Sequence, residues 1–282
     1  MKKVKRSARL VEMTQYLISR PHTLIPLATF VERYDAAKSS ISEDLTIIKE
    51  VLDQNQTGEL QTIAGAAGGV KYIPGIGREE AMQVIKKLCE ELEDSDRILP
   101  GGYLYMSDLL GRPLLLDVIG RMFASAFKHR QIDVVMTVET KGIVLAHATA
   151  AHLNVPVVIV RRDNKVTEGS TVSINYVSGS TKSIRTMSLA RRALAEESNV
   201  LIIDDFMKAG GTVQGMMELL KEFRARVQGV GVFVETANES VEEHLIKEYV
   251  SLARLTEVDL KSRRITVVPG NYFDQVSKEE SD

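Results

Sequence analysis

The sequence predicts an α/β protein of two domains, a small helical domain with a β-hairpin followed by a larger domain built on a mainly parallel sheet. One observation is length, because 282 residues exceed what a single hydrophobic core usually organises. A second is the row of three short amphipathic helices and a hairpin within residues 1–74. A third is the alternation of apolar strand segments with helix-length segments across residues 75–282, which is typical of a parallel sheet covered on both faces.

Composition narrows the class of protein before any motif is considered. The chain is 44% hydrophobic and 26% charged, and no stretch approaches the roughly 18 apolar residues of a membrane span. Residues 1–10 (MKKVKRSARL) lack the apolar run that follows the charged start of a secretory signal, so we expect a cytoplasmic protein with no membrane partner. Cys89 is the only cysteine, which excludes an intramolecular disulfide and disfavours a thiolate metal site.

The N-terminal domain begins with two predicted amphipathic helices. A first helix is predicted over residues 7–19 by apolar residues at helical spacing: Leu10, Met13 and Leu17. Pro21 then ends this helix. A second, shorter helix is predicted by the apolar set Leu27, Phe30, Val31 and Tyr34.

The third helix is the candidate for reading DNA. Ser40 and Glu43 form an S-x-x-E capping box, and an apolar face follows at Ile41, Leu45, Ile48 and Leu52. Two strand-like runs, ELQTI and VKYIP, flank a glycine-rich segment at residues 65–69, as in a hairpin. Three helices with such a hairpin outline a winged helix, whose third helix enters the major groove of DNA. A plain helical packing unit is the alternative.

Basic and small polar residues supply candidate DNA contacts. Residues 1–10 carry five Lys or Arg and no acidic residue, although the formal net charge of the chain is only −2. A solvated tail is the alternative for this cluster, but the helix and hairpin that follow favour double-stranded DNA as its partner. The candidate DNA-binding residues are Lys5, Arg6, Arg9, Lys38, Ser39, Ser40, Ser42, Thr46, Lys49 and Lys71.

The second domain begins after the joint PGIGR, and we divide the chain into residues 1–74 and 75–282. An acidic amphipathic helix is predicted next, over residues 79–94, with one apolar side formed by Met82, Ile85, Cys89 and Leu92. Apolar strands are predicted at residues 132–138, 155–160, 199–204 and 229–234. Because ligands of open parallel sheets bind beyond the carboxyl ends of the strands, the loops after Val138, Val160 and Asp204 form the candidate site.

The loop after the third of these strands carries the most specific pattern. Two acidic residues are followed by a glycine-rich segment: Asp204, Asp205, Phe206, Met207, Lys208, Ala209, Gly210, Gly211 and Thr212. A helix is predicted to open near Val213, and glycine-rich backbone at a helix N-terminus binds phosphate through its N–H groups. The carboxylates suit ribose hydroxyls if magnesium or Lys208 supplies positive charge nearby. A strand end with a tight Gly-Gly turn is the alternative for any lone pair of glycines.

The string VLIIDDFMKAGGT (residues 200–212) resembles the phosphoribosyl pyrophosphate (PRPP) signature of type I phosphoribosyltransferases. The resemblance implies that Asp204 and Asp205 hold the ribose hydroxyls and that residues 208–212 bind the 5-phosphate. Many members of the family have Thr or Ser in place of Ala209. One hydroxyl contact is therefore missing here, and weaker binding is implied.

Two further loops fit the same family. The family's pyrophosphate loop corresponds to Thr140, Lys141 and Gly142. In this interpretation Gly142 permits an unusual backbone conformation and Lys141 supplies charge. The polar segment 161–185 lies where such enzymes place a mobile loop over the substrate, and a solvated surface hairpin is the alternative for residues 170–183. The candidates for diphosphate contact in this segment are Arg161 and Lys165.

Across both domains the chain resembles the bacterial purine operon repressors. The resemblance rests on KSSISEDLTIIK in the third helix, GAAGGVKYIP in the hairpin and RRDNKVTEGSTVSINYVSGS before the signature. The resemblance implies a homodimer that binds the operators of purine genes and has no transferase role. It also implies that the homodimer releases the operators when PRPP, accompanied by magnesium, fills the site. It further implies that a guanosine tetraphosphate alarmone competes for the same site.

Two other functions stay open from the residues alone. A phosphoribosyltransferase for xanthine or adenine with an accessory DNA-binding domain needs groups that stack on and hydrogen-bond a nucleobase, and residues 236–282 show no clear set. The aromatic candidates are Tyr103, Tyr105, Phe206 and Tyr272, of which at least two are expected to pack in the core. A helical interaction module without DNA is disfavoured by the basic N-terminus.

Overall fold

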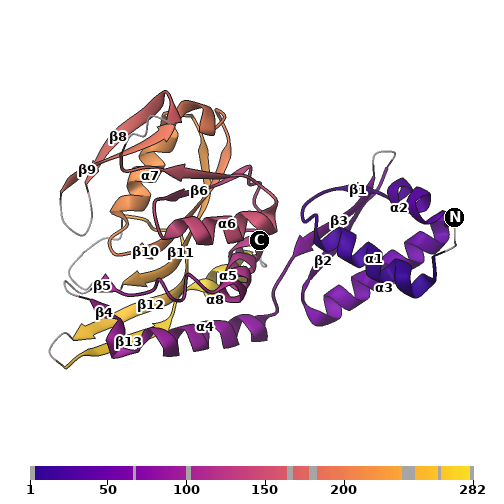
Figure 1. Cartoon of the computed structure of the whole chain (residues 1–282), viewed down its shortest axis with the longest axis horizontal. Coiled ribbons are helices and arrows are strands. Elements are labelled where there is room, and N and C mark those ends of the chain that lie inside the picture. Colours follow the sequence, from indigo (N-terminus) through magenta and orange to yellow (C-terminus); the bar gives the residue numbers. More distant parts are fainter. Residues whose placement is uncertain are drawn as a thin grey trace. The chain divides into compact units, whose positions relative to one another are not determined.

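The structure is a computed structural model, and it describes residues 4–65, 68–99, 103–163, 168–177, 183–236, 245–259 and 262–279 of the chain. It divides into two compact units, residues 1–80 with 152–154 and residues 81–151 with 155–282. Figure 1 draws the elements of each unit in sequence colours, from indigo at the N-terminus to yellow at the C-terminus. No helix in the described ranges is long and apolar enough to cross a membrane.

The N-terminal unit combines helices with a small antiparallel sheet. In chain order its elements are α1 (Arg6–Ile18), β1 (Ile25–Pro26), α2 (Leu27–Tyr34), α3 (Lys38–Asn55), β2 (Gly58–Ile63) and β3 (Gly69–Pro74). The strands lie in the order β1-β3-β2, and the predicted hairpin pairs from Gly58 opposite Pro74 to Ile63 opposite Gly69. This order of elements is that of a winged helix-turn-helix, with β2 and β3 as the wing.

The apolar stripes predicted from helical spacing meet in one core. Its buried members come from every element of the unit: Met13, Leu17, Ile25, Phe30, Tyr34, Ile41, Leu45, Ile48, Leu52, Leu60, Val70 and Tyr72. The ring of Tyr16 meets that of Phe30 edge to face, with centroids 5.7 Å apart. Strand β1 is too short to show a period-two pattern, which is why the sequence does not predict it.

The start of α3 differs from the prediction. The helix begins at Lys38, with Ala37 as its N-cap, and no side chain accepts a capping hydrogen bond there. Ser40 and Glu43 therefore lie inside the helix and do not form a capping box. The physical reason lies in the turn before them, because Asp35 ends α2 in the left-handed region, with φ of 47°, and the chain re-enters a helix soon after.

The C-terminal unit is built on a six-stranded sheet. Its strands are β6 (Val134–Val138), β7 (Val157–Val160), β10 (Asn199–Met207), β11 (Arg226–Thr236), β12 (Val250–Asp259) and β13 (Arg264–Pro269). They lie in the order β13-β12-β11-β10-β6-β7, and every neighbouring pair is parallel except β12 with β13. The mainly parallel sheet predicted from the alternating strand segments is confirmed.

Helices cover both faces of this sheet. They are α5 (Pro113–Ala126), α6 (Gly142–Leu153), α7 (Gly211–Lys221) and α8 (Tyr272–Glu279). Neighbouring residues of a strand face opposite sides. Val134 packs in the same cluster as Met216 of α7, whereas the next residue, Val135, is equally buried on the other face. On that second face Phe123 of α5 lies beside Gly231 of β11. Two buried faces explain why the strands read as continuous apolar runs.

Helix α4 (Arg78–Leu92) corresponds to the predicted acidic helix. Burial raises the pKa of the Cys89 thiol to about 11, so this thiol is a packed side chain and not a reactive one. Met82 is 51% exposed, contrary to the prediction that it lies on the apolar side. Ala81, one position earlier, takes its place in the buried face.

Two small hairpins complete the unit. Strands β4 (Ile98–Leu99) and β5 (Tyr103–Leu104) pair antiparallel, as do β8 (Thr171–Val177) and β9 (Ile184–Ala190). The polar segment predicted as either a mobile loop or a surface hairpin therefore contains a hairpin over its described residues. This hairpin packs on α7, because Tyr176 and Met187 both contact the helix at Gly215.

Candidate functional site

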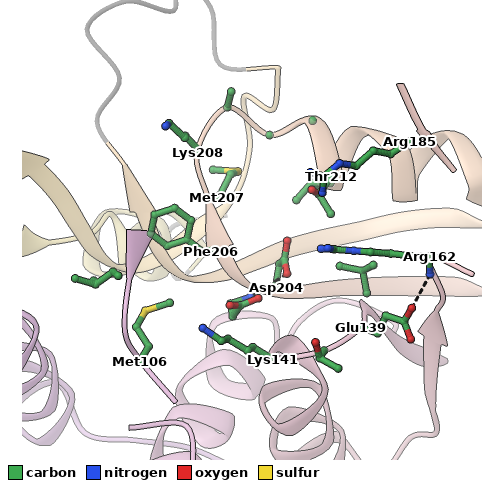
Figure 2. Close-up of a pocket in the computed structure, with 18 of the residues that line it drawn as sticks. Met106, Glu139, Lys141, Arg162, Arg185, Asp204, Phe206, Met207, Lys208 and Thr212 are labelled. Carbon is green, nitrogen blue, oxygen red and sulfur yellow. Dashed lines mark hydrogen bonds between the residues drawn. The ribbon is translucent and has the colours of Figure 1, made fainter. Parts of the chain in front are cut away.

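A pocket of about 550 Å³ lies at the carboxyl ends of β6, β7 and β10 (Figure 2). It is lined by Leu99, Leu104, Met106, Val138, Glu139, Thr140, Lys141, Arg162, Arg185, Asp204, Asp205, Phe206, Met207, Lys208, Ala209, Gly210, Gly211, Thr212 and Val213. The structure thus brings the loop after β6 and the short loop after β10 to one site. Of the remaining predicted residues, Lys165 lies outside the described residues, and Tyr103 is described only through its backbone in β5.

The glycine-rich segment forms an anion site at the start of α7. Gly210 is the N-cap of the helix and has φ of +79°, in the left-handed region that disfavours any side chain. The helix begins at Gly211, two residues before the predicted start, and β10 extends to Met207, so the connecting loop is shorter than predicted. The first N–H groups of α7 have no partner within the helix and open into the pocket, where the helix dipole favours an anion.

The two aspartates are held close together in the pocket. Asp204 is 4% exposed, and the backbone N–H of Asp205 donates to its Oδ1 at 3.0 Å. Burial, and then the charge of Asp205, raises the pKa of Asp204 well above its ordinary value. Burial also raises the pKa of Asp205, against the opposing charge of Lys141. The charges of the two carboxylates therefore disfavour each other, and their oxygens are acceptors for hydroxyl groups or a cation.

Four cations line the same pocket: Lys141, Arg162, Arg185 and Lys208. In the part of the chain that the structure describes, no ion pair joins any of them to an acidic side chain. Arg162 and Lys141 act on the aspartates only at longer range, lowering their pKa against the effect of burial. A pocket with unpaired cations and a helix N-terminus is suited to a ligand with several phosphate groups.

Arg161, which the sequence predicts as a diphosphate contact, does not line the pocket. Its guanidinium contacts the carboxylates of Glu139 at 3.2 Å and Glu168 at 3.6 Å, so its charge is already compensated. Its backbone pairs with Ser188 of β9, which fixes the side-chain direction at this position. The next residue, Arg162, lines the pocket instead, and its backbone N–H donates to Glu139 at 2.8 Å (Figure 2).

Gly142 is needed for a different reason from the predicted one. Its φ is not in the left-handed region, so no unusual backbone conformation is required of it. A Cβ at this position would lie 2.3 Å from Oγ1 of Thr137 and 3.5 Å from Oδ1 of Asp204. Gly142 therefore lets the start of α6 approach the floor of the pocket. The preceding loop contains a cis peptide bond between Glu139 and Thr140.

The far end of the pocket is apolar. It is formed by Leu99, Leu104, Met106 and Phe206, and Figure 2 shows Met106 and Phe206 at the end opposite Thr212 and Arg185. The hairpin β4–β5 is held by Arg97, which donates to both oxygens of Asp108 at 2.6 and 2.9 Å. These bonds lower the pKa of Asp108 to about 2. Leu99, Leu104 and Met106 belong to no motif, so sequence reasoning predicted only Phe206 at this end.

The other aromatic candidates differ in position. Tyr272 is 2% exposed and packs against Phe273 in the core, whereas Tyr105 is 43% exposed and does not line the pocket. Phe206 alone among the described aromatic side chains of that set reaches the pocket.

The predicted DNA-binding residues are mostly exposed on the winged helix. Lys5 and the polar face of α3 are open to solvent at Lys38, Ser39, Ser42, Thr46 and Lys49, while Ser40 and Lys71 are half-buried. Arg9 is 9% exposed, and its Nε lies 2.6 Å from the buried carboxylate of Asp44. Arg9 is thus a structural residue and is not available to a DNA phosphate. Arg6 reaches the same carboxylate at 2.8 Å but stays half exposed.

Comparison with known proteins identifies both units. Residues 5–74 match the family model described as the N-terminal part of the bacterial purine repressor, and residues 106–262 match that of the phosphoribosyl transferase domain. The chain is 59% identical over 271 residues to the purine biosynthesis transcriptional repressor of Bacillus subtilis, covering 96% of this chain and 94% of the relative. The chain belongs to the bacterial purine repressor family.

Relatives within the purine repressor family differ in their named effect on transcription. The purine biosynthesis transcriptional activator of Lactococcus lactis subsp. lactis is 44% identical over 271 residues, with 96% of this chain and 99% of the relative covered. Among solved structures, adenine phosphoribosyltransferase from Thermoanaerobacter pseudethanolicus matches with a TM-score of 0.52 and 19% identity, over 60% of this chain and 98% of that one. The latter match supports the fold of the C-terminal unit.

Proposed function

We propose that the chain is a repressor of purine biosynthesis genes that binds double-stranded operator DNA as a homodimer and is released when PRPP fills the pocket. One observation carries the effector part of the proposal. The buried Asp204 and the half-buried Asp205 lie beside a helix N-terminus, and the same pocket is lined by four cations that form no ion pair within the described part of the chain. A sugar with free hydroxyls and phosphates at both ends satisfies all of these groups together.

Each part of PRPP has complementary groups in the pocket. The carboxylates of Asp204 and Asp205 accept hydrogen bonds from the ribose hydroxyls, which stabilise the charged forms that burial disfavours. The 5-phosphate occupies the N-terminus of α7, at residues 208–212. The diphosphate faces Thr140, Lys141 and Arg162, and magnesium accompanies it as its counter-ion.

The apolar end supports a second ligand of the same site. Met106 and Phe206 offer a base-sized apolar surface beyond the aspartates. A guanosine tetraphosphate alarmone has a purine for this surface and phosphates for the cations, so it competes with PRPP in this proposal. In this proposal the protein acts in the cytoplasm.

The names of the relatives support the sign of transcriptional control. The repressor of Bacillus subtilis at 59% identity favours repression, although the family also contains proteins named activators. Release by PRPP requires that the free form binds PRPP more tightly than the DNA-bound form does. A coupling of about 1 to 3 kcal/mol weakens operator binding roughly 5-fold to 150-fold at saturation.

The decisive experiment is a titration of purine operator fragments with the purified full chain, with and without PRPP and magnesium. Expected are tight binding without PRPP, a loss of affinity within the range above with PRPP, and a dimeric mass by sedimentation. Operator affinity that PRPP leaves unchanged would contradict the effector role. A chain without residues 1–74 that retains operator affinity would contradict the role of the winged helix.

The competing function is a purine phosphoribosyltransferase, which the transferase-type fold and the apolar end of the pocket favour. Transfer requires groups that hydrogen-bond the edge of a nucleobase, and the described lining of the apolar end is formed by aliphatic, thioether and phenyl groups with Lys208 nearby. We therefore expect no nucleotide from PRPP, magnesium and adenine, guanine, hypoxanthine or xanthine. Steady release of pyrophosphate near the roughly 10 per second median of enzymes would establish the transferase instead.

A further inference from the structure

The hairpin β8–β9 is fixed to the helix whose N-terminus faces the pocket. Helix α7 passes under the hairpin at Gly215, where an added Cβ would lie 2.8 Å from Cε of Met187 and 2.9 Å from the ring of Tyr176. Such close contact leaves no room for a side chain on the helix. The hairpin therefore lies directly on α7, and Gly215 is one helical turn, about 6 Å, from the first residue of the helix.

The register of the hairpin places Arg185 on the face that meets the helix. Arg185 pairs directly with Tyr176, and residues opposite each other in antiparallel strands share a face. The neighbouring residue, Thr186, points to the other face and donates to Asn175 at 2.9 Å, and both of these residues are exposed. Alternation along the strand thus sends Arg185 and Met187 toward α7 and Thr186 toward solvent.

Arg185 carries its charge into the phosphate end of the pocket. Its side chain lines the pocket together with Thr212, and Figure 2 shows the two residues at the same end, away from Phe206. No acidic side chain in the described part of the chain forms an ion pair with it, in contrast to Arg161, which is bound by Glu139 and Glu168. A half-buried guanidinium without a partner is costly unless a ligand supplies the anion.

We propose that Arg185 binds the 5-phosphate of the effector, so that this phosphate at the N-terminus of α7 is held between the helix and the β8–β9 hairpin. The inference rests on the proposed function and deepens it, because it assigns the phosphate specificity of the same site to a residue outside the glycine-rich loop. The guanidinium of Arg185 adds a charged donor to the backbone N–H groups of α7. Arginine suits this role because its planar group can donate two hydrogen bonds to one phosphate.

The test is calorimetric titration of the full chain with three probes: ribose 5-phosphate, pyrophosphate, and PRPP with magnesium. Arg185→Ala is expected to weaken binding of ribose 5-phosphate and of PRPP by a similar factor, roughly 10-fold to 150-fold, because a hydrogen bond to a charged group contributes this much. Pyrophosphate, facing Lys141 and Arg162, keeps its affinity. The matched control is Arg191→Ala, which removes an exposed guanidinium just beyond β9, outside the pocket lining.

Arg185→Met separates charge from packing, since it keeps the aliphatic stem. It is expected to lose ribose 5-phosphate as Arg185→Ala does. Wild-type affinity for ribose 5-phosphate in Arg185→Met, or an equal loss of pyrophosphate in Arg185→Ala, would overturn the role of Arg185. A wild-type chain that binds none of the three probes would overturn the proposed function itself. A wild type that binds PRPP, together with variants that bind it equally well, would overturn only the role of Arg185.

Discussion

Basic side chains gather in two regions of the molecule, and they are used in opposite ways. In the winged helix Arg9 and Arg6 both bind the carboxylate of Asp44, whose side chain is fully buried. In the pocket of the C-terminal unit Arg162 and Arg185 have no ion-pair partner in the described part of the chain. The first arrangement is complete without a ligand, and the second is not.

The difference shows that ion-pair partners, more than the number of basic residues, distinguish structural arginines from ligand-binding ones. In the sequence, Arg6 and Arg9 belong to a basic cluster that resembles a DNA-binding tail. Asp44 lies far along the chain, so the sequence gives no sign that it pairs with them. Thirty-five positions separate Arg9 from its partner, so only the fold reveals the pair. The pocket cations come from three loops and from strand β9, and in the described part of the chain no acidic side chain forms an ion pair with them.

The largest effect is expected from Asp44→Ala. The change leaves the guanidinium of Arg9, which is 10% exposed, without a partner in the core. Breaking a buried ion pair by removing one member costs about 3 to 5 kcal/mol, so the winged helix should unfold at a much lower denaturant concentration. Asp53→Ala, on an exposed position of the same helix, is the control and should change little. Equal stability of the two variants would show that the pair contributes nothing.

Asp204→Asn should affect the ligand and not the fold. It removes one acceptor for the ribose hydroxyls, so PRPP affinity falls by about 1.5 to 3 kcal/mol, while operator binding persists without PRPP. It also removes one of two repelling charges, so the melting temperature of the empty protein should not fall. Melting temperature and operator affinity, each measured with and without PRPP, check both parts. A marked loss of stability would instead make Asp204 a structural residue, like Asp44.

A pH series on the empty protein sharpens the same contrast. Burial raises the pKa of Asp204 and of Asp205 above the value of about 3.9 in an unfolded chain. The folded state therefore binds these protons more tightly, and the pair lowers stability as the pH rises through the interval from the unfolded pKa to the raised ones. The difference in unfolding free energy between wild type and Asp204→Asn should shrink as the pH falls. A difference that is constant with pH would mean that the pKa values are not raised.

The smallest effect is expected from Lys38→Ala, on the exposed start of α3. One lost phosphate contact reduces the slope of log affinity against log salt by roughly 0.9 and weakens all DNA sequences alike. Lys87→Ala, an exposed lysine of α4, is the charge-matched control. An unchanged salt slope in Lys38→Ala would remove this residue from the DNA interface.

Local patterns predicted most of the elements, and long-range contacts account for the misses. The helix stripes and the apolar strands depend on neighbours in the sequence, and both appear as expected in α1 and in β10. The PRPP signature likewise lies within one continuous segment. Other pocket residues meet this segment only through folding, so no spacing could indicate them: Leu99, Leu104, Met106, Arg162 and Arg185. Ser40 shows the reverse failure, because a valid local capping pattern is overridden by the turn at Asp35.

The repelling carboxylates of Asp204 and Asp205 also bear on how long the protein survives in a cell. Burial raises the free energy of the charged forms of the buried Asp204 and the half-buried Asp205. A ligand that binds only the folded state adds RT ln(1 + [L]/Kd) to the stability, which reaches about 2.7 kcal/mol at 100 times Kd. Degradation of a marginally stable protein follows its unfolded fraction. When PRPP is scarce, the regulator is therefore most susceptible to proteases unless it is bound to operator DNA. The supply of PRPP then sets the abundance of the regulator as well as its occupancy of operators.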